Sequence, residues 1–531
     1  MFRSKRIAQR VVESAVSAEF IERARCGCTE DSARYSKLRL LSVSVLLFCA
    51  TVMPAHASTI AVTNTNDSGT GSLRQALTAA SEGDTITFAV TGTIVLTSGG
   101  LPINKNITIS GPGPDQLSID GNQALLVFGI FPDKTATISG LTIRNAQSGI
   151  WNFGTLAISD CVLSGHSGAG VYNVRILTAS NCVISNNSGH GLFNDHATLT
   201  VSDCVITANS YSGIYNYNSH GPSSSVEHGN DRRDANKIDG PSPGDLTIAN
   251  TIISDNSEPG IYNDGGYVMI LNSRLTGNSD GQGYGGAGIS IGSFKTPGGV
   301  TVINSTISGN SASGGGGGIG ISYGGVTLVN STISGNSAGD AGGGISNSSG
   351  GVQVINSTIS GNSAGKIGGG IASSGGVHLT NSTISGNSAG SAGGIYYVQG
   401  QYPYTNEISN TIFNAGALGE NIVNNGATVT SHGYNLSSDD GGGLLIGPGD
   451  QINTDPLLGP LRDHGGPTLT HMPMRGSPAI DAGDPSFTQT PDHDQRGACF
   501  LRVFGGRIDV GSVETQPRPQ CVTPAPRPTP H

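Results

Sequence analysis

The chain has 531 residues and a formal net charge of −10, yet 12% of its residues are charged, 5% are aromatic and 82 are glycine. This composition excludes a large globular core rich in aromatic side chains, and the low charge content excludes a highly charged disordered chain. The acidic balance disfavours nucleic acid as a partner, because phosphate binding needs Lys and Arg. We therefore expect one long repetitive body.

Residues 1–57 have the features of an export signal. Lys37 and Arg39 precede an apolar run, and Ala55-His56-Ala57 is a small-residue cleavage site. The run is too short for a comfortable membrane span, so we expect no transmembrane span in the mature chain. The long polar extension before it indicates either a later translation start or a specialised export signal. Cleavage after Ala57 predicts a secreted or cell-surface protein.

Removal of this segment also changes the charge. It takes away 9 of the 27 Lys and Arg and 5 of the 37 Asp and Glu, which leaves a mature charge near −14. A surface of that sign disfavours anionic membranes as well as nucleic acid.

Residues 58–122 are predicted to form an N-terminal cap and the first strands. The segment SLRQALTAA has Leu73, Ala76, Leu77 and Ala80 on one helical face, and Ser72 is a plausible N-cap. A short helix here would cover the open end of the first coil, which otherwise exposes unpaired backbone.

Residues 123–409 repeat with a fixed period. The octapeptide NSTISGNS begins at Asn304, Asn330, Asn356 and Asn381, so the period is 26, 26 and 25 residues. Such a period predicts stacked units, and the abundance of Gly, Asn, Ser and β-branched residues favours strands over helices. We therefore predict a β-solenoid in which one repeat is one coil. Counting equivalent Asn or Asp positions from residue 140 to Asn410 gives about eleven coils.

Each repeat alternates inward and outward side chains. Val300, Val302 and Ile307 should point inward and Thr306 and Ser308 outward. The asparagines at the corners, such as 304 and 310, can form amide ladders with the coils above and below. The outward hydroxyl array is compatible with ice binding, but ordinary strand composition also explains it.

The cysteines are of two kinds. Cys161, Cys182 and Cys204 recur at one position of three successive coils, which predicts either a stack of small side chains or one disulfide with a third, free thiol. In an oxidising compartment we expect a disulfide between Cys499 and Cys521, tying the Pro-rich tail to the body.

An aromatic residue recurs at one outward register in the early coils. With the preceding aliphatic residue and the following Asn inward, the rings must face out, and five coils span about 19 Å. Flat rings with polar edges suit extended glycans, whereas stacking between coils would merely stiffen the sheet. The predicted ligand-binding residues are Trp151, Tyr172, Phe193, Tyr215 and Tyr262.

Catalytic candidates lie beside these rings. Arg175 and His196 each follow an inward Asn by two residues, and Asp195 is adjacent. A polysaccharide lyase or hydrolase needs a base or paired carboxylates on an exposed face. Residues 217–245 interrupt the period and are predicted to form a charged insertion loop. No Asp cluster repeats from coil to coil, so we expect no metal and no cofactor.

Both ends resemble known modules. TNDSGTGSLRQALTAASEGDTITF with LPINKNITISGPG is similar to the CSLREA domain, although residues 71–76 read GSLRQA. The coils resemble right-handed parallel β-helix repeats of pectate-lyase-like and polymorphic outer-membrane proteins. In residues 410–514, DPLLGPLRDHGGPTLTHMPMRGSPAIDAGDP and DQRGACFLRVFGGRIDVGSVE resemble the choice-of-anchor Q domain, with short strands and turns closing the last coil. Residues 515–531 form a Pro-rich tail.

These resemblances imply an exported bacterial protein with an all-β, right-handed parallel β-helix and carry no established reaction with them. Our hypothesis is that it binds extended polysaccharide, or acts in adhesion, through the outward rings. A polysaccharide lyase or glycoside hydrolase on the same face is the first alternative, and a purely structural surface protein is the second.

Overall fold

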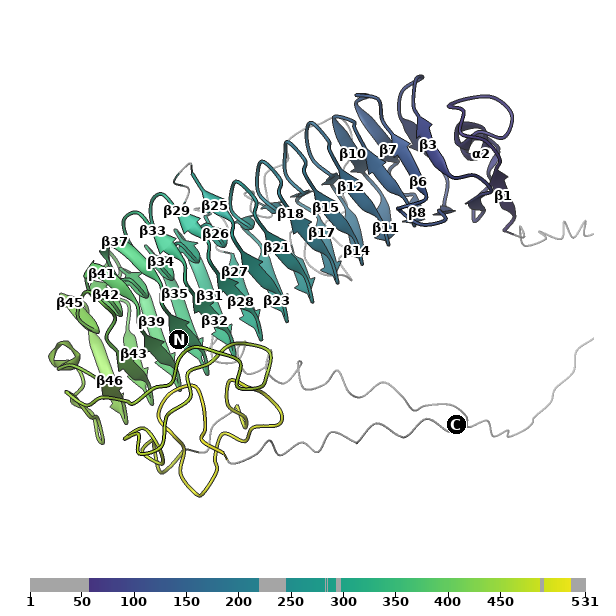
Figure 1. Ribbon diagram of the computed structural model, residues 1–531. Helices are drawn as coiled ribbons and strands as arrows, with labels where there is room; N and C mark the ends of the chain where they lie inside the picture. Colours follow the sequence, from purple (N-terminus) through teal and green to yellow (C-terminus); the bar gives the residue numbers. More distant parts are fainter. Residues whose placement is uncertain are drawn as a thin grey trace, which may run out of the picture. The chain divides into compact units, whose positions relative to one another are not determined.

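The computed structural model describes residues 57–218, 245–281, 283, 285–292, 298–487 and 491–516. The described residues belong to one compact unit. Its described strands form parallel sheets in which each strand pairs with its equivalents one coil before and one coil after, so the fold is the predicted right-handed parallel β-helix (Figure 1).

Sheet A contains fifteen strands among the described residues. In spatial order these are β1 (Thr59–Val62), β2 (Thr85–Phe88), β5 (Ile107–Ser110), β8 (Thr135–Ser139), β11 (Thr155–Ser159), β14 (Ile176–Ser180), β17 (Thr198–Ser202), β20 (Leu246–Ala249), β23 (Tyr267–Leu271), β27 (Gly299–Ile303), β31 (Gly324–Val329), β35 (Gly350–Ile355), β39 (Gly376–Thr380), β43 (Asn406–Ser409) and β46 (Val429–Gly433).

Sheet B contains fourteen strands within the same described ranges. They are β3 (Gly92–Val95), β6 (Leu117–Asp120), β9 (Thr142–Arg144), β12 (Val162–Ser164), β15 (Val183–Ser185), β18 (Val205–Thr207), β21 (Ile252–Ser254), β24 (Arg274–Thr276), β28 (Thr306–Ser308), β32 (Thr332–Ser334), β36 (Thr358–Ser360), β40 (Thr383–Ser385), β44 (Ile412–Asn414) and β47 (Leu436–Ser437).

Sheet C contains thirteen described strands, and the short sheet D contains five. Sheet C consists of β4 (Leu101–Ile103), β7 (Leu126–Ile130), β10 (Ser148–Asn152), β13 (Val171–Asn173), β16 (Leu192–Asp195), β19 (Ile214–Tyr217), β22 (Ile261–Asp264), β26 (Ile289–Ile291), β30 (Ile319–Ile321), β34 (Ile345–Asn347), β38 (Ile371–Ser373), β42 (Ile395–Val398) and β45 (Ile422–Asn425). Sheet D consists of β25 (Ser279–Asp280), β29 (Ser311–Ala312), β33 (Ser337–Ala338), β37 (Ser363–Ile367) and β41 (Ser388–Ser391).

The sheets extend beyond the periodic segment from which about eleven coils were predicted. Strands before Leu126 and strands β44 to β47 continue the same three sheets at the two ends. The residues assigned to the cap and to the C-terminal coils therefore contribute strands to the solenoid itself. A coil runs from sheet C through sheet A to sheet B, and sheet D lies at the corner that leads from B back to C.

The core is a set of aligned aliphatic stacks. Val300, Val302 and Ile307 are buried, as predicted, and their equivalents above and below pair with them in the same register. Because each stacked side chain removes apolar surface from water on the coil above and the coil below, stability accumulates between neighbouring coils.

The two predicted asparagine corners behave differently. At the Asn310 corner an amide ladder runs through successive coils, with Nδ2 of each residue donating to Oδ1 of the next. Its members are Asn187, Asn209, Asn256, Asn278, Asn310, Asn336, Asn362 and Asn387.

The Asn304 corner differs from the expected ladder. Asn304, Asn330, Asn356 and Asn381 all have φ near +50°, and within the described structure the side-chain Oδ1 of each lacks a hydrogen-bond partner. Asn and Asp tolerate this left-handed conformation better than other side chains. In these four coils the Asn therefore serves chiefly the sharp turn from sheet A to sheet B, whereas at the same corner of earlier coils Asn181 donates to Asp160 and Asn272 donates to Asn250.

The helix α2 (Leu73–Ala79) lies where it was predicted. The Ser72 Oγ accepts a hydrogen bond from the Gln75 backbone N–H, and Leu73, Ala76 and Leu77 are buried. Arg74 holds the entry in place by an ion pair with Asp67 at 2.6 Å. No described helix is long and apolar enough to cross a membrane.

The C-terminal segment, residues 455–487 and 491–516, packs against the outer face of sheet B in the late coils. Its strands are isolated bridges, and the 3-10 turn η2 (Gly441–Gly443) precedes it. The Thr358 Oγ1 donates to the Gln495 Oε1 at 2.6 Å, and the Thr332 Oγ1 donates to the Leu469 carbonyl oxygen at 2.7 Å. The segment thus covers a sheet face, in contrast to the expectation that it would close the last coil.

This packing also buries part of the outward hydroxyl array. Thr306 and Ser308 are partly exposed as expected, but Thr332, Thr358 and Thr383 are buried beneath the C-terminal segment. An array covered by its own chain offers no continuous surface to ice. In these late coils the regular hydroxyls serve as docking partners instead.

The cysteines follow the simpler of the two predictions. Cys161, Cys182 and Cys204 are free and buried, and form a stack of small side chains. Cys499 is disulfide-bonded. Cys521, its predicted partner, lies outside the described residues.

Candidate functional site

Five aromatic side chains lie in one register on successive strands of sheet C. Strand pairing aligns Trp151 with Tyr172, Tyr172 with Phe193, Phe193 with Tyr215, and Tyr215 with Tyr262. All five side chains remain partly exposed. We call this row the aromatic strip.

A second amide ladder fixes the strands that carry the strip. Asn152, Asn173, Asn194, Asn216 and Asn263 each follow a strip residue, are buried, and are joined from Nδ2 to Oδ1 along the row. Because alternate residues of a strand point to opposite faces, the inward asparagines force the preceding rings outward. The sequence prediction of both orientations is confirmed.

The rings stack on one another along the strip. Ring centroids are 5.1 Å apart for Tyr172 and Phe193, 5.1 Å for Phe193 and Tyr215, and 4.9 Å for Tyr215 and Tyr262, with interplanar angles of 19°, 4° and 6°. Trp151 is tilted by 54° against Tyr172. The faces of the inner rings therefore contact one another, and mainly the ring edges point outward from the strip.

A partly buried histidine packs against the strip from the side. The His190 ring lies 5.4 Å from that of Phe193 and 4.8 Å from that of Tyr215. Burial lowers the pKa of His190 to about 4, because desolvation penalises the imidazolium form. At neutral pH this side chain is an uncharged packing partner.

A hydrogen-bonded network joins the strip to two of the three predicted catalytic residues. The Tyr172 hydroxyl donates to the Asp195 Oδ2 at 2.7 Å, and the His196 Nδ1 contacts the Asp195 Oδ1 at 2.5 Å. Desolvation, followed by the hydrogen bond to Asp195 and its negative charge, raises the pKa of Tyr172. Tyr172 is therefore a neutral proton donor at physiological pH.

The third predicted residue is held elsewhere. The Arg175 Nη1 donates to the Asp133 Oδ1 at 2.5 Å in an ion pair whose side chains are 48% and 84% exposed. Such an exposed pair contributes little to stability. The structure thus brings Asp195 and His196 together with Tyr172 and pairs Arg175 with Asp133.

Sequence reasoning missed two residues in the same column as Asp195. Strand pairing aligns Asp195 with Tyr217 and Tyr217 with Asp264. The signal was present, because LFND, IYNY and IYND place these residues directly after the ladder Asn of three coils. The predicted insertion loop between β19 and β20 falls largely in residues 219–244, which lie outside the described residues.

The described residues contain no group of three or more His, Cys, Asp or Glu side chains arranged to hold a metal ion.

Comparisons with known proteins agree with the fold. A family model described as a right-handed beta helix region matches residues 82–230, and the search of curated proteins found no match. The resemblances to the CSLREA and choice-of-anchor Q modules stay predictions.

Three solved structures illustrate the likeness. The chain is similar to the mannuronan C-5 epimerase AlgE6 A-module of Azotobacter vinelandii, with 14% identity, coverage of 69% of this chain and 97% of that chain, and a TM-score of 0.39. It is similar to the Agl-KA catalytic domain, with 18% identity, 71% and 69% coverage, and a TM-score of 0.42. For pectate lyase Pel9A the values are 14%, 86%, 96% and 0.33. Likenesses at this level concern the β-helical fold, and no activity is transferred to this chain from them.

Proposed function

We propose that this protein is exported and binds an extended polysaccharide along the aromatic strip. The observation that carries the proposal is the row of five partly exposed aromatic side chains in register on β10, β13, β16, β19 and β22. The row is about 19 Å long at about 4.8 Å per coil, a spacing comparable to one sugar residue. If the export signal delivers the protein to the cell surface, the same binding would serve adhesion.

The stacked geometry determines the kind of contact expected. Ring edges carry the positive part of the aromatic quadrupole, and the Tyr172 hydroxyl, whose proton is donated to Asp195, can still accept a hydrogen bond. These edges suit the hydroxyl oxygens of a sugar, while ring carbons between them contact its C–H groups. A chain of sugars lying across the edges would meet a repeating pattern of both kinds.

Retention of polysaccharides by the purified protein tests the proposal. Tyr215→Ala removes the ring between Phe193 and Tyr262 and should raise the Kd for a retained polysaccharide by about tenfold, because about 50 Å² of apolar contact with a sugar is lost at about 25 cal/mol per Å². Tyr172→Ala should act in the same direction. Tyr267→Ala is the matched control, because this tyrosine is 69% exposed on sheet A, away from the strip.

Two outcomes would contradict binding through the strip. Unchanged retention in both strip variants would refute binding through the strip. Loss of thermal stability without any polysaccharide retained by the native protein would favour the structural alternative, in which the rings only join neighbouring coils.

The network of Tyr172, Asp195 and His196 favours a second candidate function, cleavage of the bound polysaccharide. Asp195 orients both neighbours, so that His196 could act as a base and neutral Tyr172 as an acid at the edge of the strip. Release of unsaturated or reducing ends would support this candidate, and it should vanish in Asp195→Asn and His196→Ala while retention persists. Product release that survives both substitutions would refute these roles.

A further inference from the structure

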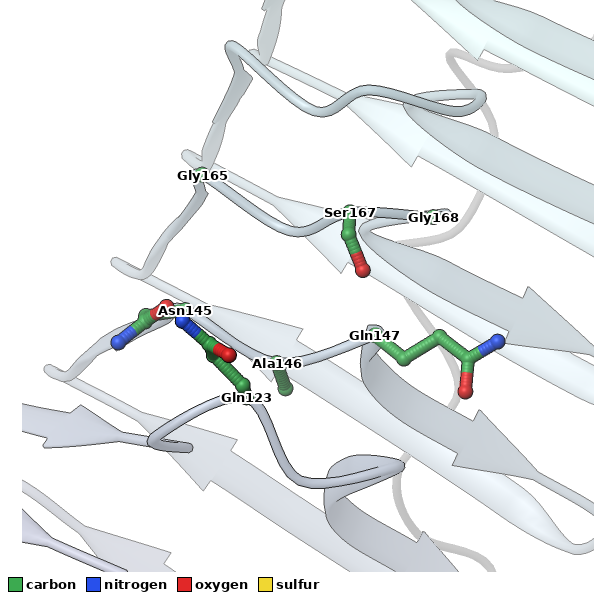
Figure 2. A pocket seen from close by; sticks show the side chains of 7 residues that line it. All are labelled: Gln123, Asn145, Ala146, Gln147, Gly165, Ser167 and Gly168. Carbon is green, nitrogen blue, oxygen red and sulfur yellow. The ribbon is translucent and has the colours of Figure 1, made fainter.

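A polar depression lies at one end of the strands that begin the strip. Its lining comes from the B-to-C corner of three successive coils and consists of Gln123, Asn145, Ala146, Gln147, Gly165, Ser167 and Gly168 (Figure 2). Its volume is about 460 Å³, which falls within the usual range for small-molecule sites. We call it the corner pocket.

The pocket lies beside the first residues of two strands that carry strip residues. Gln147 directly precedes β10, which carries Trp151, and Gly168 lies shortly before β13, which carries Tyr172. Trp151 is the fourth residue after Gln147, about 13 Å away along an extended chain, so a branch or chain end that leaves the strip at Trp151 could reach the pocket.

The backbone of the pocket is held firmly. The Ser167 N–H donates to the Ala146 carbonyl oxygen at 2.9 Å, and the Gly168 N–H donates to the Gln147 carbonyl oxygen at 2.6 Å. The Gln147 N–H donates to the Ala124 carbonyl oxygen at 2.8 Å. These bonds tie three coils together and leave the Gln and Ser side chains to face the pocket and solvent.

The side chains that line the pocket are uncharged. Gln123, Gln147 and Ser167 supply amide and hydroxyl groups, which can both donate and accept hydrogen bonds, whereas the Asn145 Nδ2 already donates to Asp120. Figure 2 shows the Ser167 hydroxyl pointing toward the loop that carries Ala146 and Gln147. Pairs of donor and acceptor groups match the vicinal hydroxyls of a sugar.

The groups behind this lining are also neutralised. The His166 Nδ1 accepts from the Ala146 N–H at 3.3 Å and its Nε2 lies 3.1 Å from the Ile143 carbonyl oxygen, so the ring is fixed as a neutral tautomer. Burial lowers the pKa of His166 to about 4. Asp120, which accepts from the Asn145 Nδ2 at 2.7 Å, is paired with Arg144.

The strip itself has acidic neighbours. Asp195 and Asp264 lie in its sheet, and Glu258 and Asp264 are close enough to Tyr215 to disfavour its ionisation, after the larger effect of burial. The nearby Arg175 is already paired with Asp133. A polymer with one carboxylate on each sugar would meet repulsion along this described surface.

We propose that the corner pocket is a sugar subsite beside the aromatic strip, and that the ligand class is an uncharged polysaccharide, with a branch or chain end seated in the pocket. This inference rests on the proposed function. It extends that function by predicting that the protein prefers neutral glycans to polyuronates, a preference that the fold alone does not predict.

The test compares each polymer in a neutral and in a charged form. The full protein is titrated with galactomannan and xyloglucan, and with the same polymers after oxidation of their C6 alcohols to carboxylates. The neutral forms should bind, and oxidation should raise the Kd at least tenfold in low salt, with the difference shrinking as salt screens the charge. Oxidised forms that bind as tightly as the neutral ones, or more tightly, would overturn the assigned ligand class.

Variants separate the pocket from the strip. Gln147→Ala and Gln123→Ala each remove an exposed amide and should raise the Kd about three- to tenfold, as expected for one hydrogen bond. Gln353→Ala, at an exposed glutamine of β35 in sheet A, is the matched control. Binding that weakens in Tyr215→Ala but not in either Gln variant would overturn the pocket and leave the strip in place, whereas the absence of binding to every polymer would refute both proposals.

Discussion

The amide ladder at the Asn310 corner offers a sharp test of what holds the coils together. In the substitution Asn336→Ala, one buried side chain with four hydrogen bonds is removed. The Asn336 Nδ2 donates to the Asn362 Oδ1 at 2.9 Å and to the Ile307 carbonyl oxygen at 3.0 Å. Its Oδ1 accepts from the Asn310 Nδ2 at 2.9 Å and from the Asn310 backbone N–H at 3.0 Å.

The groups left behind determine the magnitude. The Asn310 Nδ2 still donates to Leu275, and the Asn362 Oδ1 still accepts from the Asn336 backbone N–H, so these losses are small. The Asn310 backbone N–H is left buried without its partner, which costs about 2 kcal/mol. With about 0.5 kcal/mol for each of the other three bonds, we expect a loss of about 3 to 4 kcal/mol in the free energy of unfolding.

The assay must report on individual coils, because a repeat protein need not unfold in one step. Hydrogen exchange measured on peptides covering residues 305–340, together with urea unfolding followed by circular dichroism, would locate the loss. Ser337→Ala is the control, since its Oγ makes one accessible hydrogen bond to Ser311. A loss below about 1 kcal/mol, or one equal to that of the control, would refute the role assigned to the ladder.

Two further predictions concern the C-terminal segment and the cysteine stack. Burial, and then the charge of Asp509, raise the pKa of Glu514 to about 8, so the folded protein binds more protons than the unfolded chain between pH 4.5 and about 8, and stability should fall as pH rises across that window. Below about pH 6.5 the lowered pKa values of His166 and His190 make stability rise with pH, so the decline due to Glu514 should be measured above that range. The melting temperature should therefore decline from pH 7 to 9, and Glu514→Gln should flatten this part of the profile; an equal slope in the variant would contradict the assignment. Cys161, Cys182 and Cys204 are buried free thiols, so a thiol reagent should label them only after denaturation, and labelling of the native protein at these positions would show that the coils open there.

Much of the solenoid could be predicted because its information is local and repeated. The alternation around Ile307 and the inward asparagines beside Tyr172 and Tyr215 follow from the period of two along a strand, and coil spacing then fixes which residues are neighbours. The helix at Leu73–Ala79 followed from its N-cap and apolar face. Each of these features depends on residues within one coil or on the same position of the next.

The contacts that sequence reasoning missed depend on side-chain geometry or on distant segments. Tyr172 reaches Asp195 across one coil and Arg175 reaches Asp133 in an earlier corner, and neither choice of partner is encoded in the repeat. The Thr358 hydroxyl looks like any outward strand residue, yet it bonds Gln495, 137 residues away. Periodicity defines the row in which a side chain lies and leaves open what covers that row.

The outer face of sheet B in the late coils is covered, whereas the outer face of sheet C in the early coils is partly exposed. The size of the outward side chains explains this difference. On sheet B of the late coils, the Thr332 and Thr358 side chains are short enough for another backbone to approach, and the C-terminal segment is bonded to both. On sheet C of the early coils, the stacked rings from Trp151 to Tyr262 are larger than threonine side chains and are partly exposed. The covered face and the face proposed to bind polysaccharide thus lie on different sheets and in different coils. It follows that Glu514→Gln should alter stability without altering polysaccharide affinity, whereas Tyr215→Ala should alter affinity directly; coupled changes in both would mean that the two faces communicate through the core.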